Sequence, residues 1–77
     1  MNINLANYQW LVSDPDLLGG KPVIRGTRLS AAFILACLSA GMSPDEIRET
    51  YAPFPDEALP EIMKLASTVL DETAAAV

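Results

Sequence analysis

Ten consecutive positions, residues 19–28, hold most of the basic side chains that can contact an anionic partner. They read Gly-Gly-Lys-Pro-Val-Ile-Arg-Gly-Thr-Arg and contain three of the chain's four glycines and three of its five basic residues. Arginine donates hydrogen bonds from a planar fork that fits carboxylate and phosphate groups. This segment, called the basic loop below, therefore predicts a surface for an anionic partner, either phosphate or the acidic face of a protein.

The basic loop has the composition of a short strand between two tight turns. Gly19, Gly20 and Gly26 are expected to shape these turns, because glycine adopts positive φ without a steric penalty. The side chains around the second turn should point outward, and four residues are the candidate partner-binding positions: Lys21, Arg25, Thr27 and Arg28. The alternative is a structural hairpin whose arginines cover the core or pair with Asp14 and Asp16.

The remaining composition favours binding over catalysis. The chain has no histidine, no spacing of metal ligands, no phosphate-binding loop, and no nucleophile with a neighbouring base. We therefore expect no enzyme activity, no cofactor and no metal. Nearly all carboxylates lie in the expected first turns of helices, a position that the helix dipole favours, or on polar faces. Cys37 lies in an apolar stretch, which predicts a buried, inert thiol and a reducing, cytoplasmic location.

Length and hydrophobicity predict one small domain that associates with something else. The 77 residues are 51% hydrophobic, and a chain this short buries only part of such a surface by itself. We expect a single domain over residues 1–77, with an ordered core over about 7–72 and a frayed tail over 73–77. A homodimer is the expected assembly, with residues 8–12 as a free strand edge. No apolar run is long enough to span a bilayer, so no membrane contact is expected.

The order of elements predicts a mainly α fold with a short β hairpin at its N-terminal end. Residues 8–12 and the basic loop should supply the strands, with a loose helical turn at 15–18 between them. Three helices are expected after the hairpin, over residues 31–40, 44–51 and 56–71, and Ser30 and Ser43 should cap the first two. The first of these helices has no charged residue and is expected to be the central, buried one.

The third predicted helix has an apolar stripe with spacings of three and four residues. We expect the stripe to face the core, and its members are Leu59, Ile62, Met63, Ala66, Val69 and Leu70. Pro60 lies early in this helix and should delay or bend its start.

Three helices with Gly41 at a turn are also typical of a helix-turn-helix, homeodomain-like bundle. In that fold the last helix enters the major groove of DNA. Here it begins with Asp56, Glu57 and Glu61, and residues 43–77 have a net charge of −6. Since phosphate repels such a helix, the residues predict weak DNA binding by the chain alone and favour a protein partner.

The basic loop and its surroundings resemble a prokaryotic family known as domain-of-unknown-function family 433. The resemblance covers about residues 7–70 and rests on Asp14-Pro15, Leu17-Leu18, residues 19–28, the apolar stretch 31–41, and residues 43–46 (Ser-Pro-Asp-Glu). It implies a helix-turn-helix-like fold. It also implies a role as the antitoxin of a toxin–antitoxin pair, whose toxin resembles PIN-type ribonucleases.

This resemblance and the residues together lead to three functional hypotheses. The first is an antitoxin-like protein that neutralises a cognate PIN-like toxin by direct contact. PIN-type enzymes use clustered carboxylates with divalent metal, as the family implies, and these carboxylates are groups that Arg25 or Arg28 can engage. The second is a transcriptional autoregulator that binds operator DNA as a dimer through the basic loop. The third is a structural dimerisation module.

Overall fold

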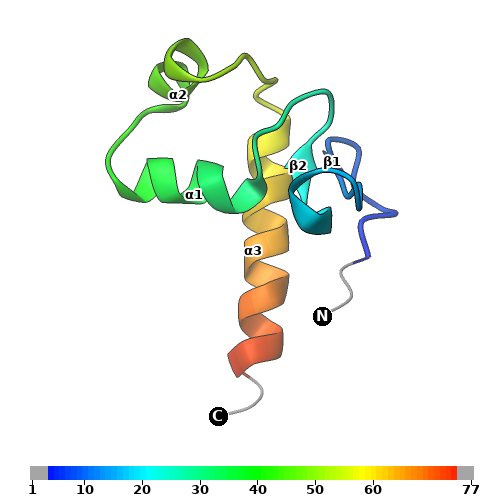
Figure 1. Ribbon diagram of the computed structural model, residues 1–77. Coiled ribbons are helices and arrows are strands. Elements are labelled where there is room, and N and C mark those ends of the chain that lie inside the picture. Colours follow the sequence, from blue (N-terminus) through cyan, green and yellow to red (C-terminus); the bar gives the residue numbers. More distant parts are fainter. Residues whose placement is uncertain (1–3, 75–77) are drawn as a thin grey trace.

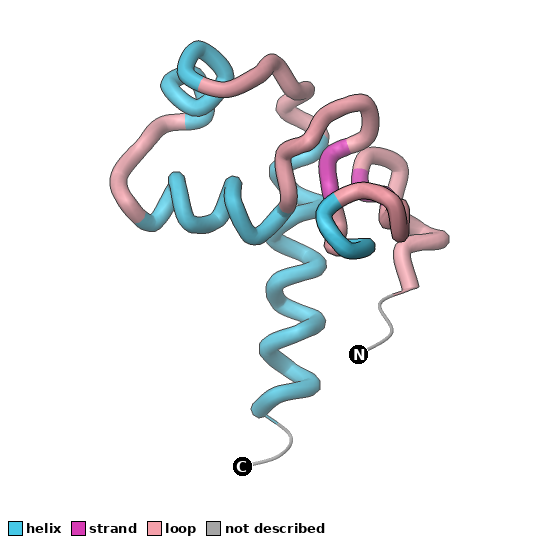
Figure 2. The backbone as a smooth tube through the Cα atoms, in the orientation of Figure 1, coloured by secondary structure: helices cyan, strands magenta, loops and turns pink. Residues whose placement is uncertain are grey.

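The computed structural model describes residues 4–74 and has the mainly α fold that the sequence predicts (Figure 1). Two short strands and a 3-10 turn precede three helices, and loops make up most of the N-terminal part (Figure 2). The elements are β1 (Leu11–Val12), η1 (Leu18–Gly20), β2 (Val23–Ile24), α1 (Ala31–Ser39), α2 (Pro44–Thr50) and α3 (Ala58–Ala74). No helix within residues 4–74 is long and apolar enough to cross a membrane.

The two strands form an antiparallel pair in which Leu11 faces Ile24. The predicted strand over residues 8–12 is wrong in length, since β1 begins only at Leu11. The reason is a contact with α3. The backbone amides of Gln9 and Trp10 donate to the two carboxylate oxygens of Glu61, at 2.9 and 2.7 Å. These amides are therefore satisfied by a side chain, and this segment does not offer the open strand edge that the sequence predicts.

The 3-10 turn η1 replaces the loose helical turn predicted for residues 15–18. Leu18, Gly19 and Gly20 have φ values of 52°, 66° and 83°, so three successive residues adopt the left-handed conformation. The hydroxyl of Ser13 donates to the carbonyl of Gly20 at 2.6 Å and holds the turn against the end of β1. Leu18 is the residue with a side chain in this series, and its conformation costs roughly 1–2 kcal/mol relative to an ordinary backbone.

The starts of the first two helices confirm the predicted caps. The side chain of Ser30 accepts from the amide of Phe33, and that of Ser43 accepts from the amide of Glu46. Glu46 in turn accepts from the amide of Ser43 and completes a capping box. The hydrogen bond from the Ser43 amide, joined by one from its side chain, lowers the pKa of Glu46 below its ordinary value of 4.5.

The core lies where one face of each helix meets the two strands. Its largest fully buried members are Leu11, Val23, Ile24, Ile34, Ile47 and Ile62. Cys37 is a buried free thiol, as predicted. The expectation that α1 is the central, buried helix holds for one of its faces only, because Ala32, Phe33 and Ala36 on the other face are exposed. Phe33 instead packs its ring edge-on against Tyr51 at the end of α2, with a centroid distance of 4.7 Å.

Helix α3 is longer than predicted at its C-terminal end, and its second half extends away from the body of the domain (Figure 1). Residues 73 and 74 belong to α3, so the predicted frayed tail is wrong for them, while 75–77 lie outside the described residues. The predicted inward stripe is also partly wrong. Met63 and Leu70 are 49% and 67% exposed, whereas Ala58 and Leu65, outside that stripe, are buried.

Candidate partner-binding surface

The basic loop turns sharply between β2 and α1. The amide of Thr27 donates to the carbonyl of Ile24 at 3.0 Å, which closes a four-residue turn. Gly26 is the third residue of this turn and has a φ of 79°, the feature that defines a type II turn and favours glycine. No atom lies within 4 Å of the position that a Cβ on Gly26 would occupy. The requirement for glycine here is therefore conformational and not a matter of space.

Thr27 holds this turn from within. Its hydroxyl donates to the carbonyl of Ile24 at 2.8 Å and accepts from the amide of Leu29 at 3.0 Å. The amide of Ile24 also donates to the carbonyl of Leu29, and Val23 forms a β-bridge with Ser30. Of the four predicted partner-binding residues, Thr27 is thus the half-buried one whose polar group is already used inside the loop.

Arg25 anchors the loop to the segment before β1. Its amide donates to the carbonyl of Trp10 at 2.8 Å, and its Nε donates to the carbonyl of Gln9 at 2.9 Å. Glu61 binds the amides of the same two residues, so this dipeptide is held through its carbonyls by Arg25 and through its amides by α3. Arg25 is exposed as predicted, and it also has a structural contact that the sequence does not reveal.

Lys21 and Arg28 are the basic side chains of the loop that the fold leaves unused. Both are exposed, and neither side chain makes a hydrogen bond or ion pair with any residue in the described range. The alternative in which the loop arginines pair with Asp14 and Asp16 is not observed within residues 4–74. The structure therefore separates the predicted site into two residues with internal contacts, Arg25 and Thr27, and two without, Lys21 and Arg28.

Arg48 is a structural residue whose role the sequence does not reveal. Its Nε donates to the carbonyl of Phe54 at 2.9 Å, and its guanidinium lies 4.5 Å from the centroid of the Phe54 ring. It also forms ion pairs with Asp45, at 2.8 Å, and with Asp56. One guanidinium thus ties α2 to the connection that leads into α3.

Only part of this network leaves a signal in the sequence. Asp45 and Arg48 are three residues apart on a helix, a spacing at which opposite charges meet. The contact between Arg48 and Asp56 spans a proline-rich connection, and that between Glu61 and Gln9 joins residues 52 positions apart. No local pattern predicts either contact. In the described part of the chain, no group of three or more His, Cys, Asp and Glu side chains is placed to hold a metal ion.

Comparison with known proteins identifies the family that this loop and fold define. Residues 11–63 match the family described as "Protein of unknown function (DUF433)". Because the match covers more than half of the chain, the chain belongs to this family, as the resemblance of the basic loop implies. The matched range contains the whole loop, α1, α2 and the first turns of α3.

A relative is found in Sinorhizobium fredii. The protein described as "Uncharacterized protein y4eO" is 39% identical to this chain over 46 residues, which cover 60% of the chain and 21% of the relative. The chain therefore spans about a fifth of the length of this relative. No solved structure matches the chain.

Proposed function

We propose that this protein is an antitoxin that neutralises a PIN-like ribonuclease by direct contact through the basic loop. The observation that carries the proposal is the pair of exposed cations, Lys21 and Arg28, on a loop with closed internal hydrogen bonds. The rest of the fold uses its other arginines: Arg48 is paired with carboxylates and Arg25 is bonded to the backbone. The proposed location is the cytoplasm, where such a toxin meets its RNA substrates.

Physical chemistry favours an acidic protein as the partner of these cations. An exposed, solvated arginine adds roughly 0–1 kcal/mol to folding even when paired. At a desolvated interface the loss of one arginine commonly costs about 2 kcal/mol of binding free energy. The clustered carboxylates implied for a PIN-like enzyme offer acceptors for a guanidinium fork. A turn fixed by Thr27 and Gly26 also lowers the entropy cost of ordering the loop on binding.

Co-expression with the product of the neighbouring gene tests the proposal, which requires that product to be a PIN-like protein. Arg28→Ala is expected to weaken co-purification at least about tenfold and to restore ribonuclease activity, with a melting temperature close to wild type. Lys64→Ala is the matched control, because it removes one exposed positive charge from α3. Among residues 4–74, its amine contacts only the Tyr8 ring, 5.4 Å from the centroid. Lys64→Ala should leave the complex intact.

Two results would contradict this function. The first is that the double variant Lys21→Ala, Arg28→Ala binds the toxin as tightly as wild type. The second is that Lys64→Ala weakens toxin binding as much as Arg28→Ala does, which would indicate a general effect of charge. Arg25→Ala is kept out of this test, because it also removes the bond to Gln9 and changes the fold as well as the surface.

A DNA-binding autoregulator is the second candidate, and the same two cations favour it. In this case the basic loop, rather than α3, would contact operator phosphates, since the first turns of α3 carry Glu61 and follow Asp56 and Glu57. The expected binding by the chain alone is weak at physiological salt, because phosphate contacts are few and the net charge is −5. A gel-shift titration against the DNA upstream of the gene measures this, and tight, sequence-specific binding would favour the second candidate.

A further inference from the structure

Helix α3 carries two apolar seams, and the domain covers one of them more fully than the other. The first seam consists of the buried Ala58, Ile62 and Leu65 and the half-buried Val69, with spacings of four, three and four residues. The second seam, one residue further along, has the same spacings and consists of Leu59, Met63, Ala66 and Leu70. Two of its members, Met63 and Leu70, are 49% and 67% exposed. Spacings of four and three residues are the pattern by which one helix packs against another.

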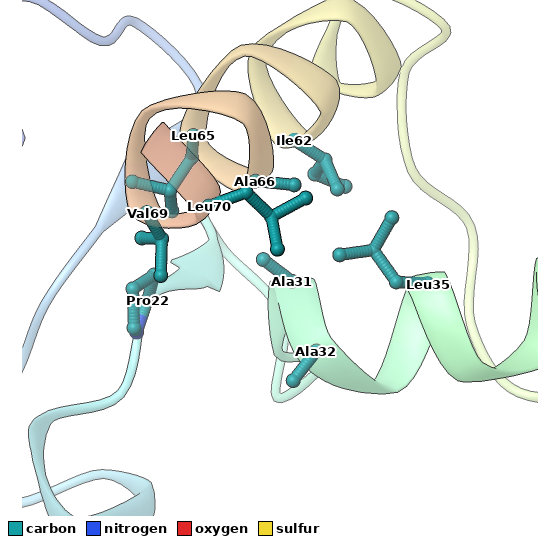
Figure 3. A pocket seen from close by; sticks show the side chains of 9 residues that line it. All are labelled: Pro22, Ala31, Ala32, Leu35, Ile62, Leu65, Ala66, Val69 and Leu70. Carbon is teal, nitrogen blue, oxygen red and sulfur yellow. The ribbon is translucent and has the colours of Figure 1, made fainter. Parts of the chain in front are cut away.

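An apolar groove lies beside this second seam. It has a volume of about 370 Å³, and Figure 3 shows Ala31 and Leu35 of α1 facing α3 across it, with Pro22 beside Val69. Small side chains on both walls, among them Ala31 and Ala66, leave the space open. Every lining residue is apolar, so the groove has no side-chain polar group to orient a small ligand. The seam also continues beyond the groove to Met63, which indicates an elongated occupant.

We infer that α3 of a second copy of this chain occupies the groove, antiparallel to the first α3, and that this contact makes the protein a homodimer. A two-fold interface needs a projection and a recess within the same patch. Leu70 is the projection, and the recess lies over Ala66, four residues earlier on the same seam. When the two helices cross at the level of Thr68, Leu70 of each copy lies at the level of Ala66 of the other.

Two copies of a chain with a net charge of −5 repel each other over most of their surfaces. Lys64 and Asp71 lie on a side of α3 that points away from the second seam. The seam itself carries no charge, so the two negatively charged chains meet where repulsion is least. This inference concerns the chain alone and is independent of the proposed toxin contact.

Light scattering and sedimentation of the full chain, without a partner, test the dimer at micromolar to submillimolar concentration. Leu70→Lys is expected to raise the dimer dissociation constant at least about tenfold, since a charge replaces a buried projection. The monomer should keep its fold, because Leu70 is largely exposed in it. The matched control is Leu18→Lys, a substitution at an apolar residue 47% exposed on η1, and this variant should remain dimeric.

Cross-linking gives a second readout that is independent of affinity. Ser67→Cys, one residue from the proposed crossing level, should form covalent dimers with a short bis-maleimide, whereas Thr68→Cys, on the far side of α3, should not. The buried Cys37 gives little background. A monomeric wild type, a dimer that survives Leu70→Lys, or equal cross-linking at both cysteines would overturn the inference. The inference would also be overturned if the protein were a monomer and Leu70→Lys abolished only the binding of the toxin. The groove would then be a binding site for the toxin and not for a second copy.

Discussion

Arginines lie in or beside two connections of the molecule, and they have opposite roles there. At the connection between α2 and α3, Arg48 bonds the Phe54 carbonyl, lies over the Phe54 ring and pairs with two aspartates, and its side chain is only 21% exposed. In the basic loop, the backbone and Thr27 close the turn by themselves, and Arg28 contacts nothing else in the described chain through a hydrogen bond or ion pair. Arg25 is intermediate, because one of its nitrogens is bonded to Gln9.

This difference indicates how to separate folding arginines from binding arginines. A connection rich in proline has few backbone donors, so the α2–α3 corner depends on a side chain to hold it together. The turn of the basic loop is closed by its own hydrogen bonds and needs no charged side chain to stabilise it. A charged side chain beside this turn is therefore free to bind a partner. The stability of the domain should therefore depend on Arg48 and on the residues that hold the basic loop in place. It should not depend on Lys21 and Arg28.

The largest expected effect is at Arg48. Arg48→Ala removes a charged donor from the Phe54 carbonyl and a cation from its ring, and these losses together amount to about 3 kcal/mol of unfolding free energy. The two ion pairs add little, because their aspartates are exposed. Arg28→Ala, the matched substitution in the basic loop, should change stability by less than about 0.5 kcal/mol. Urea denaturation of both variants measures the difference, and equal losses would remove the distinction between the two regions.

The sequence predicts the parts of the fold that depend on local spacing. The caps at Ser30 and Ser43, the breaks at Gly41 and in the basic loop, and the mainly α class all follow from neighbouring residues, and the structure confirms them. The sequence fails where a contact is long-range. Glu61 is expected to repel DNA phosphate from the tip of the third helix, but in the structure its carboxylate binds the amides of Gln9 and Trp10.

The apolar stripe of α3 shows a second limit. Helical spacing gives the width of the apolar arc but not how much of it the domain covers. Residues 58–70 contain two adjacent seams, and the predicted inward stripe combines members of both. The domain is too small to cover both, so Met63 and Leu70 remain exposed. For the candidate site, the sequence identifies the exposed cations but not the bonds that anchor Arg25 and occupy Thr27.

The second-largest effect is expected at Glu61, which holds the segment that Arg25 grips from the other side. Glu61→Gln keeps one acceptor oxygen but places an amide N–H₂ group against a backbone donor. The loss should be about 2 kcal/mol of unfolding free energy, as for a hydrogen bond to a charged group. Hydrogen exchange should show faster exchange at the amides of Gln9 and Trp10, and unchanged protection of these two amides would contradict the assignment. Glu57→Gln, just before α3 and with no side-chain hydrogen bond to any residue within 4–74, is the control.

Gly26 gives a smaller, purely conformational effect. Gly26→Ala places a Cβ in open space but at a φ of 79°, so the expected cost is roughly 1 kcal/mol, from the left-handed backbone alone. Gly26→Asn should cost less, since asparagine tolerates this region better. Thermal denaturation ranks the three proteins. If alanine and asparagine were equally destabilising, residue 26 would not be held at positive φ. The conclusion that a fixed turn positions Arg28 would then be wrong.

The smallest effect is a pH dependence at the capping box of α2, the helix that carries Arg48. The amide and side chain of Ser43 lower the pKa of Glu46 in the folded protein below its ordinary value of 4.5. A carboxyl group with a lowered folded pKa stabilises the protein above its unfolded pKa, and this contribution is lost as the pH falls through the folded value. Wild type should therefore melt slightly above Glu46→Gln at neutral pH, and the gap should narrow below pH 4.5. Glu49→Gln, on the same helix but outside the capping box, should show no such narrowing. A gap that stays constant from neutral to acidic pH would mean that the Ser43 contacts do not favour the charged form of Glu46.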